Sequence, residues 1–172
     1  MQPAHIVVRH WADWISASPL SQWLQDQLWI VPTSQSIHLV MIGVVFGCAL
    51  VLNLRILGIS TSGRPVSTLV RTLVPWIYFA MVVLLITGVI QTITEPVRQF
   101  ITPAFWWKMF MIIVVTFVTQ WLARSVRNNP EKWDNGSTRP RAAAIVALVS
   151  LALWIGIIYC GRFIAYTWEL HL

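Results

Sequence analysis

Charged residues are scarce in this chain. Only 10% of its 172 residues are Asp, Glu, Lys or Arg, while 57% are hydrophobic; soluble proteins carry about 25% charged residues. No water-soluble core could bury this much apolar sequence. The scarcity of charge therefore excludes a soluble globular domain and predicts a protein whose solvent is lipid.

Catalytic signatures are also missing. The expected membrane spans contain no Asp, and the chain has no G-x-S-x-G, H-E-x-x-H or P-loop pattern. The two cysteines, Cys48 and Cys160, fall at different expected depths in the membrane, so we expect no disulfide between them. These absences argue against an independent catalytic activity on a soluble substrate.

Four long apolar stretches are the main positive signal. The hydrocarbon core of a bilayer is about 30 Å thick and needs about 20 helical residues to cross it. Four windows fit this length, and we expect transmembrane helices at about 36–57, 74–93, 104–123 and 142–161. Short loops join them, so the chain is predicted to form an all-α membrane protein, a four-helix up-down bundle in a single integral membrane domain over 1–172.

The segment before the first span, 1–35, is rich in tryptophan. Four of the chain's 11 tryptophans alternate here with Gln, Asp and Ser: Trp11, Trp14, Trp23 and Trp29. An indole ring that is apolar at one end and wet at the other suits the headgroup layer. We therefore expect one or two amphipathic helices on the membrane surface, ending near 31–32.

The basic residues predict the orientation. The connections between spans one and two and between spans three and four hold eight Lys and Arg, and the rest of the chain holds four. An excess of Lys and Arg marks the cytoplasmic side, so we expect a multi-pass protein of the bacterial inner membrane with both termini in the periplasm. Topology thus explains the net charge of +6, and no nucleic-acid partner is expected.

This topology places several ionisable residues at one level, near the periplasmic ends of the spans. The candidates are His38, Arg98, Lys108 and Arg162, together with Glu95. Ionisable groups in a membrane are costly and usually face the bundle interior or a cavity. We therefore expect a cofactor site here, with His38 as the metal ligand and the three cations binding carboxylates of the cofactor.

Each of these residues also has a simpler interpretation. His38 can hydrogen-bond to a neighbouring helix, as a packing residue without a ligand. Lys108 and Arg162 can extend to lipid headgroups. Glu95 can end a helix and pair with Arg98.

Several motifs, taken in order, resemble a known family. They are Ile37-His38, Asn53-Leu54-Arg55-Ile56-Leu57-Gly58, Val74-Pro75-Trp76, Thr87-Gly88, Thr94-Glu95-Pro96-Val97-Arg98, Thr102-Pro103-Ala104-Phe105 and Gly161-Arg162-Phe163-Ile164-Ala165-Tyr166. Over nearly its whole length the chain resembles a family of small bacterial four-span proteins classified as a domain of unknown function. More distantly it is similar to the membrane domain of copper resistance protein D and to four-helix b-type cytochromes.

The resemblance implies a four-helix bundle with a histidine on the first span, which matches His38. It also implies a second histidine near the inner end of span three, but residues 119–124 of this chain contain none. A haem held here would take its second ligand from water, a weak ligand or another subunit.

Three functions follow as hypotheses. The first is a membrane protein that binds haem b near the periplasmic side and acts in electron transfer or as a membrane anchor. The second is copper or other metal transport or sensing, although the candidate ligands Met41, Cys48 and Cys160 are scattered. The third is a structural or assembly subunit without a cofactor. The partners expected are the lipid bilayer, a periplasmic redox partner and further copies of the chain.

Overall fold

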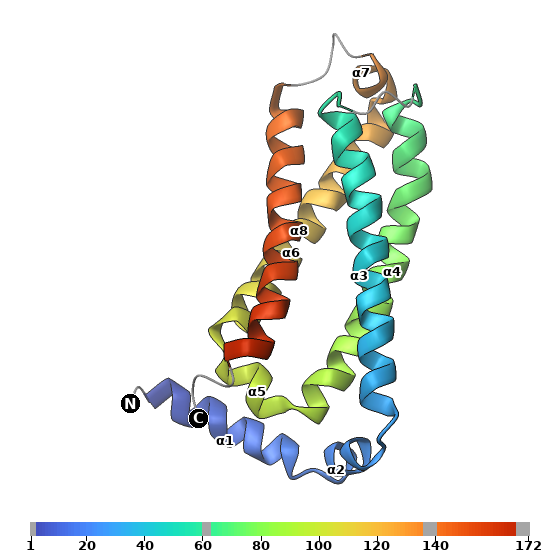
Figure 1. The fold of residues 1–172 in the computed structure, drawn as a ribbon. Coiled ribbons are helices and arrows are strands. Elements are labelled where there is room, and N and C mark those ends of the chain that lie inside the picture. The colour runs from blue at the N-terminus through green and yellow to red at the C-terminus, as the bar shows by residue number, and fades with distance from the viewer. Residues whose placement is uncertain (1–2, 60–62, 136–140, 168–172) are drawn as a thin grey trace.

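Four long helices dominate the computed structural model, which describes residues 3–59, 63–135 and 141–167 (Figure 1). These helices are α3 (Ile30–Ile56), α4 (Val66–Thr94), α6 (Pro103–Asn128) and α8 (Arg141–Thr167). Each is long and apolar enough to cross a membrane, and the described residues contain no strand. The prediction of an all-α membrane protein with four transmembrane helices is confirmed.

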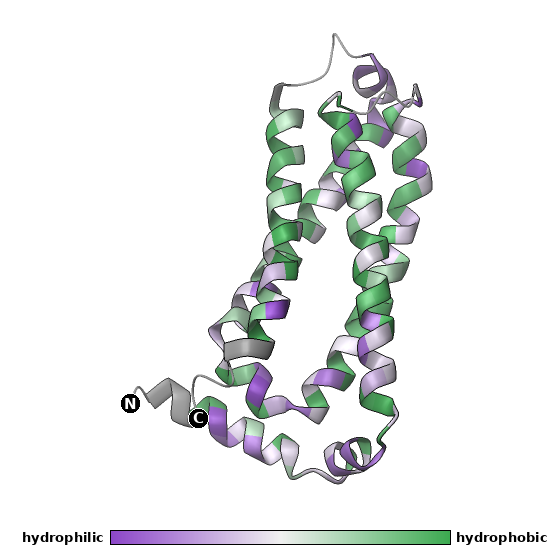
Figure 2. Ribbon diagram, in the orientation of Figure 1, coloured by the Kyte–Doolittle hydropathy of each residue, from purple (hydrophilic) through white to green (hydrophobic). Residues whose placement is uncertain are grey.

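The bundle consists of two helix pairs. α3 packs along α4, and α6 packs along α8; α3 also contacts α8, whereas α4 and α6 contact each other less. Hydrophobic residues cover the long helices, and hydrophilic residues gather toward the two ends (Figure 2). We call these ends the α7 end and the α5 end, after the short helices α7 (Pro130–Asp134) and α5 (Pro96–Ile101) that lie there (Figure 1).

The buried apolar core lies toward the α7 end. One cluster joins twelve buried residues of the described chain, among them Leu52, Val70, Leu122, Trp133 and Ala147, from five different helices. A second cluster of seven, including Val45, Val115 and Trp154, fills the middle of the bundle. The helix pairs are therefore held together by apolar packing from the α7 end to mid-bundle.

α4 differs from the sequence-based expectation. The second span was expected to begin at about 74. Instead one helix begins at Val66 and continues through Pro75. The proline is exposed on the bundle surface, and membrane helices tolerate proline because neighbouring groups satisfy the freed carbonyl.

α3 also begins earlier than expected. The surface helices were expected to end near 31–32, but α3 already starts at Ile30 and includes Pro32. A proline in the first turn of a helix costs little, because the N–H that it lacks would have had no partner within the helix. The first long helix therefore extends six residues beyond the expected start of the span.

Two short helices, α1 (Pro3–Ser16) and α2 (Pro19–Asp26), lie across the α5 end (Figure 1). Ser18 caps α2, since its side chain accepts a hydrogen bond from the backbone N–H of Ser21. Ser21 Oγ donates to the Ile93 carbonyl at 2.7 Å, and Gln25 Nε2 donates to the Thr94 carbonyl at 2.8 Å. α2 therefore satisfies carbonyls at the C-terminal end of α4, which have no partner within that helix.

Candidate functional site

His38 lies on α3 and faces α4. The first span was expected to begin at about 36, which would put His38 in its first turn. Because α3 begins at Ile30, the histidine lies in the third turn of the helix instead. Its side chain is half-buried, and its Nδ1 lies 2.7 Å from Thr87 Oγ1 of α4. The contact joins two helices that pack along their length.

The surroundings of Thr87 indicate which nitrogen of His38 carries the proton. The Thr87 hydroxyl has one proton, and its oxygen lies 2.9 Å from the Val83 carbonyl, to which it can donate. A hydroxyl that donates to this carbonyl can only accept from the imidazole. The hydrogen-bond network therefore favours the neutral tautomer of His38 with the proton on Nδ1 and a lone pair on Nε2.

The other nitrogen of His38, Nε2, has no partner among the described residues. The edge of the His38 ring rests against the backbone of α4 at Gly88. A Cβ placed on this glycine would lie 3.7 Å from His38 Cε1, at van der Waals contact. His38 is thus held through Nδ1, and its second nitrogen is not used by the described residues.

Lys108 approaches the same region from α6. Its side chain is half-buried, and Nζ lies 3.8 Å from the position of a Cβ on Gly161 of α8. Lys108 is within electrostatic range of His38 and of Cys160. The structure thus places His38 of α3 and Lys108 of α6 in the same region of the bundle. The sequence predicts this only through the order of the spans.

Arg98 is engaged elsewhere. It lies on α5, and its Nη1 pairs with Glu95 Oε2 at 2.6 Å. Its Nε is buried and makes no hydrogen bond within the described residues. The pairing with Glu95 agrees with the simpler interpretation of these two residues.

Arg162 occupies a more peripheral position. It lies on α8, directly after Gly161, and its side chain is exposed. Of the three candidate cations, Lys108 is therefore the one placed between helices near the histidine.

Three residues that the sequence did not single out as site residues complete this region. Thr87 and Gly88 hold the imidazole, and Ser34 Oγ, one turn before His38, lies 3.4 Å from the Thr87 carbonyl. The available signal was the spacing of Ser34 and His38, which are four apart and thus on one face of a helix. Nothing in the sequence alone pairs that face with Thr87.

No multidentate metal site accompanies His38 in the described part of the chain. Nowhere in these residues do three or more His, Cys, Asp or Glu side chains come together in a way that could hold a metal ion. The other proposed copper ligands lie apart: Met41 and Cys48 pack against the mid-bundle cluster, whereas Cys160 lies near Lys108.

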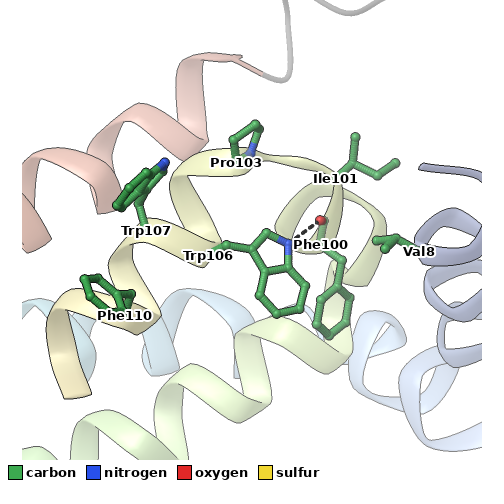
Figure 3. A pocket seen from close by; sticks show the side chains of 7 residues that line it. All are labelled: Val8, Phe100, Ile101, Pro103, Trp106, Trp107 and Phe110. Atoms are coloured by element: carbon green, nitrogen blue, oxygen red, sulfur yellow. Dashed lines mark hydrogen bonds between the residues drawn. The ribbon is translucent and has the colours of Figure 1, made fainter. Parts of the chain in front are cut away.

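A separate apolar pocket of about 560 Å³ lies at the α5 end (Figure 3). It is lined by Val8 of α1, Phe100 and Ile101 of α5, and Pro103, Trp106, Trp107 and Phe110 of α6. Trp106 Nε1 donates to the Phe100 carbonyl at 3.1 Å, so this indole presents only its ring to the pocket (Figure 3). None of the predicted site residues lines this pocket.

Comparison with known proteins assigns a family. Residues 14–167 match the family of unknown function DUF6644, so the chain belongs to that family. No curated protein and no solved structure matches the chain. The expected resemblance to an uncharacterised family is confirmed, whereas the more distant resemblance to copper resistance protein D and to b-type cytochromes stays a prediction.

Proposed function

We propose that this DUF6644 family member binds haem b near the periplasmic side of the bacterial inner membrane, with His38 as an axial ligand. Its role would be one-electron transfer, or anchoring a periplasmic redox partner to the membrane. In the expected topology both chain termini and the α5 end face the periplasm. Haem would supply the one-electron chemistry, and the chain would hold and orient it.

The observation that carries this proposal is the hydrogen bond between His38 Nδ1 and Thr87 Oγ1. A histidine that binds a metal through one nitrogen almost always donates its other N–H to an oxygen, which fixes the tautomer and the ring orientation. His38 has this arrangement, since Nδ1 is held and Nε2 has no hydrogen-bond partner among the described residues. A residue that served packing alone would not need its second nitrogen left open.

The cations fit the proposal unequally. Lys108 lies between α6 and α8 within electrostatic range of His38, so it is the best candidate to bind a haem propionate. Arg98 already pairs with Glu95, and it could offer a propionate only its remaining donors. Arg162 is exposed and would meet a propionate at the rim.

The donor set fits a haem held by one histidine of this chain better than it fits a bare metal ion. A haem iron already has four nitrogen ligands from its own ring, whereas a bare copper ion needs several from the protein. Among the described residues, His38 belongs to no group of three or more His, Cys, Asp or Glu side chains that could hold a metal ion. This comparison ranks haem above copper or another transported metal.

The test is a haem titration of the detergent-purified full chain, read by its Soret absorption and iron content. Wild type should bind one haem per chain, and His38→Ala should bind at least about tenfold more weakly, since axial ligation is lost. His10→Ala is the matched control, because His10 is an exposed histidine of α1. Absence of a Soret band and of iron from the wild type would refute the proposal.

A structural or assembly subunit is the second candidate. The observation that favours it is that the His38–Thr87 bond itself links α3 to α4. In that case His38→Ala would lower the stability of the bundle, and neither the wild type nor the variant would bind haem or copper. Copper binding by wild type that is lost in His38→Ala, without haem binding, would instead favour the metal-transport hypothesis.

A further inference from the structure

A pocket at the α7 end has no part in the proposed haem site. It has a volume of about 490 Å³ and lies where the start of α4 meets the end of α6 and the start of α7. Its lining residues are Ser67, Thr68 and Arg71 of α4, Val126 and Arg127 of α6, and Pro130 of α7. Two arginines from different helices therefore line one concave site.

These arginines are not neutralised by a neighbour. Neither Arg71 nor Arg127 makes an ion pair or a hydrogen bond with another residue of the described chain. The carboxylate that contacts the pocket lining is Asp134, whose two oxygens accept hydrogen bonds from the N–H and the hydroxyl of Ser67 at 2.9 and 2.6 Å. Arg71 and Arg127 are the charged residues among the described residues that line the pocket, so the lining itself carries positive charge.

Contacts within the protein fix the helices that form the pocket, so the site is preorganised. The two bonds from Ser67 to Asp134 tie α7 to the beginning of α4. The residue before Asp134, Trp133, is 2% exposed and belongs to the same buried cluster as Val126. A site whose elements are already fixed loses little conformational entropy on binding.

We propose that this pocket binds the phosphate headgroup of an anionic membrane phospholipid. Guanidinium groups bind phosphate through paired hydrogen bonds, and the Thr68 hydroxyl adds a further donor. Val126 and Pro130 give the pocket an apolar side that suits the glycerol and upper acyl chain. The ligand is a lipid rather than a soluble phosphate because the pocket lies at the ends of membrane-spanning helices, where headgroups are found.

The experiment uses the full chain in detergent, titrated with phosphatidylglycerol and, separately, with phosphatidylcholine, with bound lipid counted by native mass spectrometry. Wild type should bind phosphatidylglycerol in preference to phosphatidylcholine. The double variant R71Q/R127Q should bind phosphatidylglycerol at least about tenfold more weakly. The matched control is Arg124→Gln, because Arg124 is an exposed arginine of α6 outside the pocket lining.

Equal phosphatidylglycerol affinity in R71Q/R127Q and Arg124→Gln would overturn the site. Displacement of bound phosphatidylglycerol by an equal concentration of inorganic phosphate would assign the pocket to a soluble anion and overturn the lipid identity. If the double variant does not fold, R71K/R127K keeps both charges but removes the paired donors. It should lose affinity as well, and an unchanged affinity would contradict headgroup recognition by the guanidinium groups.

Discussion

The two ends of the bundle are built by different interactions. At the α7 end, twelve buried apolar residues of the described chain, drawn from five helices, form one cluster around Trp133. At the α5 end, apolar residues line an open pocket rather than forming such a cluster, and hydrogen bonds tie neighbouring helices to α4: Ser21 and Gln25 bond to its carbonyls, and His38 bonds to Thr87. A large buried apolar cluster thus marks the α7 end, whereas polar side chains of α2 and α3 contact α4 at the α5 end.

This difference suggests that the two ends of the bundle contribute differently to stability and to the proposed function. Close apolar packing holds helices in one arrangement. Ionisable groups are costly when buried in a membrane and usually mark a functional site, and His38 and Lys108 are of this kind. Under the proposed function, the α7 end is therefore the scaffold and the α5 end holds the cofactor.

The largest effect is expected at the core of the α7 end. Trp133→Ala should destabilise the protein by about 3–5 kcal/mol, because a fully buried indole is replaced by a cavity. Trp107→Ala is the matched control, since Trp107 of α6 is 64% exposed. Denaturant unfolding in detergent, followed by circular dichroism, measures both. Equal losses in the two variants would remove the contrast between the two ends.

The next effect concerns the bond that fixes α7. Asp134→Ala removes both hydrogen bonds to Ser67 at the start of α4, and we expect a loss of about 1–3 kcal/mol in the same assay. Glu131→Ala, an exposed acidic residue of the same short helix, should change stability little. If Asp134→Ala loses no more stability than Glu131→Ala, the bonds between Ser67 and Asp134 do not hold α7 in place.

At the α5 end a substitution should affect function more than stability. Thr87→Val removes the partner of His38 and should cost about 0.6 kcal/mol, the average for an interhelical hydrogen bond in a membrane. Haem affinity should fall by about 10- to 100-fold, as found when a partner of a metal-binding histidine is lost. Thr116→Val is the control, because that hydroxyl bonds only within its own helix, to Ile112. Parallel unfolding and haem titrations separate the two effects, and a large loss of stability without a change in affinity would contradict this assignment.

The smallest effect is expected for the ion pair of the α5 end. Glu95→Gln breaks the pair with Arg98, whose side chains are 41% and 29% exposed. Partly exposed pairs of this kind contribute at most about 1 kcal/mol, and the loss should shrink further at high salt. Unfolding measured at low and high salt tests this, and a salt-independent loss of several kcal/mol would mean that the pair is a buried part of the scaffold.

The long apolar runs explain why the fold could be predicted from sequence. A membrane span needs only length and hydrophobicity, and the four expected spans correspond to α3, α4, α6 and α8, with only residue 57 lying beyond a helix end. The starts of α3 and α4 could not be predicted as well. The surface helices were expected to end near 31–32 and the second span to begin at about 74, whereas Pro32 and Pro75 both lie inside long helices. Backbone context decides whether a proline ends a helix or is accommodated in it.

Of the candidate site, only the position of its residues along the bundle axis could be predicted from the sequence. Counting spans brings His38 and Lys108 to the same end, and the structure places them within electrostatic range. The contact of His38 with Thr87 depends on how far α4 is rotated about its axis, which residue spacing on one helix does not fix. The bond between Ser67 and Asp134 joins positions 67 residues apart, and no local pattern in the sequence connects them.

The most direct test of the account is the protonation of the His38 ring in the cofactor-free protein. Nitrogen NMR of protein with labelled histidine, assigned by comparison with His38→Ala, distinguishes a protonated from an unprotonated ring nitrogen. The account predicts that neutral His38 carries its proton on Nδ1, donated to Thr87, and that Nε2 bears a lone pair. A proton on Nε2, with Nδ1 accepting from Thr87, would contradict the open ligand position on which the proposed function rests.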